Sequence, residues 1–94
     1  MSKVILQGYI VVADRDLSAV ETELPKHIIR TRLEEGCLEF QVTRDSYNTN
    51  IFNVYEEFTD RNALEAHRER VKTSNWGKVS AGAERHYKIS DARV

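Results

Sequence analysis

The sequence predicts an α+β fold in which two helices cover one face of a four-stranded antiparallel sheet. Three features indicate it. A β-branched apolar run opens the chain, two segments with an alternating apolar pattern lie in its middle, and two segments with helical spacing separate the strands. Along the chain these elements have the order βαββαβ. With 94 residues and no internal repeat, the chain has room for one domain, residues 1–94.

The first strand is expected at Val4 to Ala13, where nearly every residue is apolar, as in a strand covered on both faces. A helix is expected from Asp16 to about Glu34, ending at Gly36, which can adopt the left-handed conformation of a helix cap. Pro25 lies inside this segment and is expected to kink the helix or to begin a new helical segment. The positions that recur at helical spacing are Leu17, Val20, Leu24, Ile28 and Thr31.

Two segments alternate apolar and polar residues, as strands with one buried face do. They are "CLEFQVT", residues 37–43, and "IFNVYEEF", residues 51–58. The residues between them are rich in turn formers, so the two strands are expected to form an antiparallel hairpin. "ERHYKI", residues 84–89, returns to this pattern and is expected to be the fourth strand.

The second helix is expected to begin at Arg61, because Asp60 is a good N-cap residue. One face of this helix is predicted to pack against the sheet. Gly77 and Gly82 are expected to break the chain after this helix. The complete order is that of a ferredoxin-like domain. The inward positions of the second helix are Ala63, Leu64, His67 and Val71.

Composition excludes several classes of protein. The net charge of −1 offers no basic surface for nucleic acid, and the apolar N-terminal run is too short for a membrane span, so we expect a cytoplasmic protein. The single cysteine, Cys37, cannot form an internal disulfide and has no partner for a metal site. Because the first strand is apolar on both sides, the sheet face without helices needs a cover. The simplest cover is a second copy, which gives a homodimer with a barrel-like interface.

Three segments, "GCLEFQV", "VYEEFTDRNALEAH" and "NWGKV", resemble the antibiotic biosynthesis monooxygenase domain of the dimeric α/β-barrel class. The resemblance covers about residues 4–89. In that family, a strand ending in Glu, any residue and an aromatic leads through an acidic cap and a small residue to a helix histidine. Here these are Glu56, Phe58, Asp60, Ala63 and His67. The resemblance implies a homodimer without metal or bound flavin, and a small cavity between the sheet and its own helices.

His67 and Glu56 are the candidate catalytic residues. By helical spacing His67 points inward, and an imidazole can exchange a proton with a bound phenol when a partner fixes its tautomer. Glu56 shares the face of Val54 and Phe58, where a carboxylate needs a partner, and we expect that partner to be His67. A purely structural pair, or a histidine hydrogen-bonded in the core, explains the same pattern.

Aromatic residues are the candidate substrate contacts, although aromatic residues in strands more often serve as plain core packing. Tyr55 is expected on the opposite face, toward the dimer interface, and His27 is a secondary candidate near the inward face of the first helix. Trp76 is expected near the end of the second helix, as a lid or an interface residue. The candidate contacts to an aromatic substrate are Phe40, Phe52, Phe58, Trp76 and Tyr87.

Three functions remain open at this point. The first is a cofactor-independent monooxygenase, an oxidoreductase that acts on a small phenolic or quinol-like substrate, as the resemblance implies. The second is a proton-transfer isomerase of a small, phosphorylated or unphosphorylated carbonyl compound, for which Arg30, Arg32 and Arg85 would supply cations. The third is a non-catalytic dimer that binds small molecules. No phosphate-binding glycine loop or histidine cluster indicates a cofactor or a metal.

Overall fold

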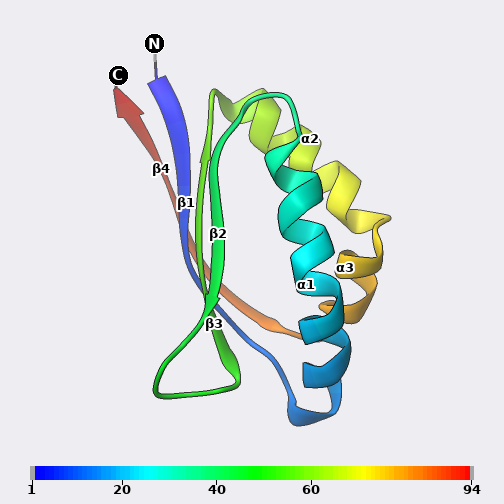
Figure 1. The fold of residues 1–94 in the computed structure, drawn as a ribbon. Coiled ribbons are helices and arrows are strands. Elements are labelled where there is room, and N and C mark those ends of the chain that lie inside the picture. The colour runs from blue at the N-terminus through cyan, green and yellow to red at the C-terminus, as the bar shows by residue number, and fades with distance from the viewer. Residues whose placement is uncertain (1, 94) are drawn as a thin grey trace.

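A four-stranded antiparallel sheet with the strand order β2-β3-β1-β4 forms one layer of the protein, and the helices form the other (Figure 1). This computed structural model describes residues 2–93. The predicted order βαββαβ and the ferredoxin-like α+β fold are confirmed. The strands are β1 (Ser2–Val11), β2 (Cys37–Arg44), β3 (Ile51–Phe58) and β4 (Glu84–Arg93), and the helices are α1 (Leu17–Arg32), α2 (Arg61–Lys72) and the short α3 (Asn75–Val79).

The hydrophobic core lies between the sheet and the helices. Alternate residues of each strand face the helices, and the antiparallel register brings Leu6 of β1 opposite Glu56 of β3, which in turn lies opposite Phe40 of β2. Glu56 is thus the polar member of an otherwise apolar row. The most deeply buried side chains of this face are Val4, Leu6, Ile10, Phe40, Phe52 and Phe58.

Gly8 in the middle of β1 allows β4 to approach closely. Its φ of +153° is rarely adopted by residues with a side chain, and a Cβ at this position would lie 1.8 Å from the carbonyl oxygen of His86. The neighbouring strand β4 continues to Arg93, beyond the predicted end at residue 89. The pairing of β1 with β4 therefore extends over the whole of β1, from Ser2 to Val11.

Helix α1 begins at Leu17, after a 3₁₀ turn at Asp14–Asp16, and it runs to Arg32 without a break at Pro25. The expected restart at Pro25 is therefore wrong. Helix α2 begins at Arg61 as predicted, because the Asp60 side chain accepts a hydrogen bond from the Ala63 amide at 2.8 Å. Helices α1 and α2 each bury a histidine against the sheet, His27 and His67 respectively.

The segment "NWGKV" forms the separate helix α3, which corrects the expectation that Gly77 ends the second helix. The Ser74 hydroxyl caps α3 by accepting a hydrogen bond from the Gly77 amide at 3.0 Å. A Cβ at Gly77 would lie 2.0 Å from the carbonyl oxygen of Val71, so glycine here lets α3 pack against the end of α2. Trp76 is therefore buried on α3, not near the end of α2.

The second face of the sheet carries no helix (Figure 1). Tyr55 lies on this face, as predicted, and its hydroxyl donates a hydrogen bond to Glu57 at 2.5 Å. The Tyr9 ring stacks on His86 with their centroids 4.6 Å apart, and Tyr9 is 38% exposed. Aromatic rings and polar side chains thus lie side by side on the sheet face that the helices leave uncovered.

Candidate functional site

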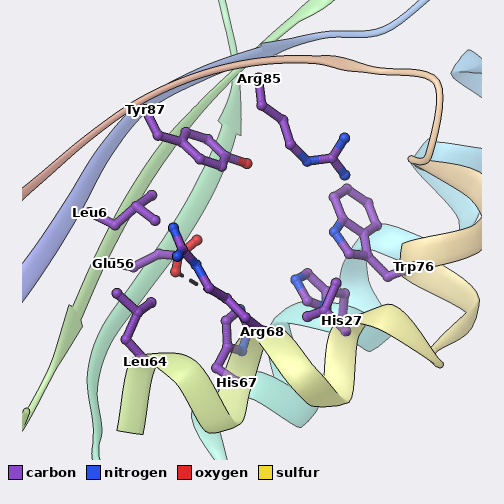
Figure 2. A pocket seen from close by; sticks show the side chains of 10 residues that line it. Leu6, His27, Glu56, Leu64, His67, Arg68, Trp76, Arg85 and Tyr87 are labelled. Carbon is purple, nitrogen blue, oxygen red and sulfur yellow. Dashed lines mark ion pairs between the residues drawn. The ribbon is translucent and has the colours of Figure 1, made fainter. Parts of the chain in front are cut away.

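A pocket of about 300 Å³ lies between the helix-facing side of the sheet and the helices (Figure 2). Every secondary-structure layer contributes to it, since its residues come from β1, β3, β4 and all three α-helices. The lining combines aliphatic and aromatic side chains with two histidines, a carboxylate and two arginines. It consists of Leu6, His27, Glu56, Leu64, His67, Arg68, Val71, Trp76, Arg85 and Tyr87.

The structure brings together in the pocket lining six of the site candidates named from the sequence. They are His27, Glu56, His67, Trp76, Arg85 and Tyr87. The three phenylalanines lie elsewhere, in the solid core. Of these, the Phe40 and Phe58 rings pack against the His67 ring, with centroid distances of 5.7 and 5.3 Å. The alternating pattern gave Phe40, Phe52 and Phe58 the correct face, but all three are buried beneath the helices and are absent from the lining.

His67 is held at one ring nitrogen and faces the pocket side with the other. Its Nδ1 is hydrogen-bonded to Glu34 Oε1 at 2.7 Å, and its Nε2 lies 3.9 Å from Glu56 Oε1. Burial lowers the pKa of His67, and the nearby Glu34 carboxylate opposes this effect. The net lowering of its pKa favours the neutral form of the ring.

Glu34 is the partner that the sequence did not reveal. It follows the end of α1, and its second oxygen accepts a hydrogen bond from Arg70 Nε at 2.5 Å. Arg70 also donates to the hydroxyl of the fully buried Thr31 at 3.1 Å. Glu34 and His67 are 33 positions apart, so no local pattern could have paired them.

Glu56 does not orient His67 as expected, because 3.9 Å is beyond hydrogen-bonding distance. Its side chain is only 8% exposed, and Oε1 is buried without a hydrogen-bond partner among residues 2–93. Burial raises the pKa of Glu56 from its ordinary value of 4.5 to about 7, while the positive charge of Arg68 acts in the opposite direction. Near neutral pH this carboxyl group can therefore both accept and donate a proton.

His27 is the second buried group without a partner. Its ring stacks on Trp76 with centroids 4.7 Å apart and an interplanar angle of 5°, and it lies 5.8 Å from the His67 ring. Its Nδ1 has no hydrogen-bond partner among the described residues. Burial, aided by the positive charges of Arg70 and Arg30, lowers the pKa of His27 to about 3. His27 is thus a neutral ring in the pocket wall.

Two arginines line the pocket, Arg68 from α2 and Arg85 from β4, and the Arg85 side chain extends toward Trp76 (Figure 2). Arg85 is fixed by α3, because its guanidinium donates to the Ser80 carbonyl at 3.0 Å and to the Ser80 hydroxyl at 2.9 Å. Among the residues that the structure describes, Arg68 makes one ion pair, a 3.3 Å contact with the exposed Glu65. Helical spacing placed Arg68 away from the His67 face, yet its long side chain reaches back to the pocket.

This arrangement suits proton transfer from a small ring that then carries negative charge. A carboxyl group and a neutral imidazole accept the proton, and the arginines favour the anion. Within residues 2–93, no three metal-binding side chains gather closely enough to hold an ion. In the same part of the chain, no helix has the length and apolar character needed to cross a membrane.

Solved structures similar to this chain share its fold over nearly the whole length. The protein PA3566 of Pseudomonas aeruginosa is 27% identical, with a TM-score of 0.69 over 99% of this chain and 93% of its own. A Nitrosomonas europaea protein assigned to the antibiotic biosynthesis monooxygenases is 19% identical, with a TM-score of 0.75 over 100% and 98% of the two chains. A similarly assigned protein of Deinococcus radiodurans is also 19% identical, with a TM-score of 0.70 over 97% and 91%.

No curated protein matches the sequence. The profile of the antibiotic biosynthesis monooxygenase family matches residues 4–78, which include β1, α1, the hairpin of β2 and β3, and α2. The match contains both candidate catalytic residues, Glu56 and His67, together with Glu34 and Arg70. The chain therefore belongs to the antibiotic biosynthesis monooxygenase family.

Proposed function

We propose that this protein is a monooxygenase that needs no cofactor and oxidises a small phenolic or quinol-like ring. Membership of the family supports an oxygenase in general terms. The observation that carries the proposal is the Glu56–His67 pair, in which a buried carboxyl with a pKa of about 7 lies 3.9 Å from a neutral imidazole in a pocket of about 300 Å³. A proton acceptor whose pKa lies near the working pH is the most effective kind of general base.

In the proposed reaction, the pair formed by Glu56 and His67 removes the hydroxyl proton of the substrate. The phenolate then gives one electron to dioxygen, and the resulting superoxide and aryloxyl radical combine to form a carbon–oxygen bond. The Glu56–His67 pair returns its proton to the peroxide anion, which becomes a hydroperoxide. Loss of water from this hydroperoxide leaves a quinone, so that one oxygen atom enters the ring and the other leaves as water. For a simple phenol, the four electrons that reduce dioxygen come from the substrate itself, so no external reductant is needed.

The remaining lining residues have supporting roles in this proposal. Arg68 and Arg85 favour the phenolate over the phenol, because a cation stabilises the charge that forms. Trp76 and His27 offer a flat aromatic surface on which a ring can stack. The apolar side chains of the lining keep water away from the radical pair.

The test is oxygen uptake with a panel of phenols and quinols, followed by product identification by mass spectrometry. His67→Ala is expected to lower uptake at least about 100-fold, the usual contribution of a general base. Glu35→Ala, at an exposed position between α1 and β2 that is not part of the lining, is the control and is expected to keep wild-type activity. Equal oxygen uptake by the wild type and by His67→Ala would contradict the mechanism.

An isomerase of a small phosphorylated carbonyl compound is the second candidate. The observation in its favour is that two arginines, Arg68 and Arg85, line the same pocket as Glu56 and His67, since arginine is well suited to phosphate. Arg30 and Arg32, the other cations considered from the sequence, are not part of the lining. Turnover under strictly anaerobic conditions would favour the isomerase, whereas a strict requirement for oxygen would exclude it.

We also propose that two copies pair through the uncovered face of the sheet. Partly exposed apolar and aromatic side chains on this face, among them Tyr9 and Tyr55, support this arrangement. Sedimentation equilibrium is expected to give twice the mass of the 10.9 kDa chain. A Tyr9→Lys variant places a charge on this face and is expected to shift the equilibrium toward monomer, whereas a wild-type monomer at micromolar concentration would refute the proposal.

A further inference from the structure

Glu34 joins two side chains of α2 through its two carboxylate oxygens. Oε1 contacts His67 Nδ1 at 2.7 Å, and Oε2 accepts the hydrogen bond of Arg70 Nε at 2.5 Å. Its side chain is only 17% exposed. A residue from the turn between α1 and β2 thus holds a histidine that lines the pocket, although Glu34 itself is not part of the lining.

The hydrogen bond to Glu34 determines which nitrogen of His67 carries the proton. An ionised carboxylate can only accept hydrogen bonds, so the neutral ring must carry its proton on Nδ1. The lone pair is then on Nε2, the nitrogen that lies 3.9 Å from Glu56 Oε1. The opposite tautomer would place two acceptors, Nδ1 of His67 and Oε1 of Glu34, against each other, and it would leave the ring without a lone pair on the pocket side.

Arg70 fixes the carboxylate in turn. Its Nε occupies Oε2 of Glu34, and its Nη2 donates to the Thr31 hydroxyl at 3.1 Å, which ties the guanidinium to the end of α1. The ion pair keeps Oε2 of Glu34 turned toward Arg70, so that Oε1 faces the His67 ring.

We propose that Glu34 and Arg70 are a positioning pair that sets the tautomer of His67, so that its Nε2 is free to accept a proton on the pocket side. The tautomer itself follows from the contacts alone. Its catalytic consequence rests on the proposed function, because only a reaction that begins with proton removal needs a free Nε2. Neither residue is expected to touch the substrate.

The sharpest test is Glu34→Gln, read by the ¹⁵N resonances of the histidine rings at pH 8. Arg70 Nε can donate its hydrogen bond only to the side-chain oxygen of the glutamine at position 34. The amide NH₂ of the variant must therefore face His67 Nδ1. A donor at that place requires an unprotonated Nδ1, and the ring is expected to switch to the Nε2–H tautomer. Oxygen uptake is expected to fall about 100-fold, as for loss of a general base.

The double variant Glu34→Gln with Arg70→Met separates positioning from mere packing. Without the guanidinium, the amide at position 34 can turn and offer its oxygen to His67. The Nδ1–H tautomer is then expected to return, and oxygen uptake is expected to recover about tenfold over the single variant. A purely structural role predicts the reverse, since the double variant loses more contacts than the single one.

The wild-type spectrum needs no variant and tests the inference even if Glu34→Gln does not fold. It must show the Nδ1–H tautomer of His67, and an Nε2–H tautomer would overturn the inference. Persistence of Nδ1–H in a folded Glu34→Gln protein would also overturn it. If the tautomers behave as expected but the wild type oxidises no phenol or quinol, the positioning pair stands and the proposed oxygenase fails.

Discussion

The two sides of His67 differ in how completely their polar groups are paired. On the side of the α1–β2 turn, Glu34 contacts both His67 and Arg70 through separate oxygens. On the pocket side, Glu56 Oε1 and His27 Nδ1 are buried and have no hydrogen-bond partner among residues 2–93. The His67 imidazole therefore lies between a network whose polar groups are all hydrogen-bonded and a pocket wall with two unpaired polar atoms.

This difference indicates that the turn side positions the His67 ring, whereas the pocket side is available to a ligand. A buried polar atom without a partner costs about 1–3 kcal/mol, so two of them in one pocket weaken the fold unless a ligand satisfies them. The turn side has no such cost and can hold the ring rigidly. Functional sites often lower the stability of the fold. Substitutions that remove the unpaired groups on the pocket side are therefore expected to stabilise the protein, and substitutions on the paired side are expected to destabilise it.

The largest effect is expected for Glu56→Gln, which keeps the shape of the side chain and removes the charge. The folded protein holds the Glu56 proton up to about pH 7, whereas the unfolded chain releases it near 4.5. Stability is therefore lost as the pH rises through this window. At pH 8 the variant is expected to be more stable by about 3 kcal/mol, the equivalent of the pKa difference.

Urea unfolding at pH 4, where the carboxyl is neutral in both states, and at pH 8 measures this effect. Glu57→Gln is the matched control, because Glu57 is on the opposite face of the same strand and is hydrogen-bonded to Lys3 and Tyr55. No gain at pH 8 is expected for the control. An equally flat pH dependence of the wild type and Glu56→Gln would show that Glu56 is not an uncompensated buried charge.

A smaller effect with the opposite pH dependence is expected for His27→Phe, which retains the aromatic contact with Trp76. The unfolded chain binds a proton at His27 below its ordinary pKa of 6.5, whereas the folded protein binds it only near pH 3. Wild-type stability is therefore lost as the pH falls from 6.5 toward 3. At pH 5 the substitution is expected to remove about 2 kcal/mol of this loss.

Thermal or urea unfolding at pH 5 and pH 8 tests this expectation, with His86→Phe as the control. His86 is on the uncovered sheet face and its side chain is 47% exposed. If His27→Phe and the wild type lose the same stability on acidification, the ring of His27 is hydrated or already charged in the folded protein.

On the paired side, Glu34→Ala is expected to destabilise the protein by about 1–2 kcal/mol. The substitution leaves Arg70 and His67 Nδ1 without their carboxylate, but Arg70 is 32% exposed, so water compensates for part of the loss. The exposed neighbour Glu35 provides the control variant Glu35→Ala, with an expected change below about 0.5 kcal/mol. A neutral or stabilising Glu34→Ala would remove the contrast between the two sides.

The fold followed from local patterns because each element is supported by short-range physics. The alternating residues of β3 and the Asp60 cap of α2 were predictable for this reason. Helix α3 was missed because glycine usually breaks helices. Here a Ser74 cap and close packing of Gly77 on Val71 outweigh that tendency.

The candidate site was predictable only in part. Periodicity gave the correct faces to Glu56 and His67, since both lie on amphipathic elements. Periodicity could not show that Phe40 and Phe58 lie in the solid core and not in the pocket wall, because this depends on where the helices cross the sheet. The Glu34 contact depends on the meeting of a turn with a helix 33 positions later, which no local pattern encodes.

The pKa of Glu56 tests the central claim most directly, because both the proposed chemistry and the contrast between the two sides of His67 depend on it. A ¹³C titration of the glutamate side-chain carboxyl groups measures it, with Glu56→Gln to assign the resonance. The structure predicts a midpoint of about 7. A midpoint near the ordinary value of 4.5 would mean that the carboxylate is ionised and solvated at neutral pH, and it would contradict the account.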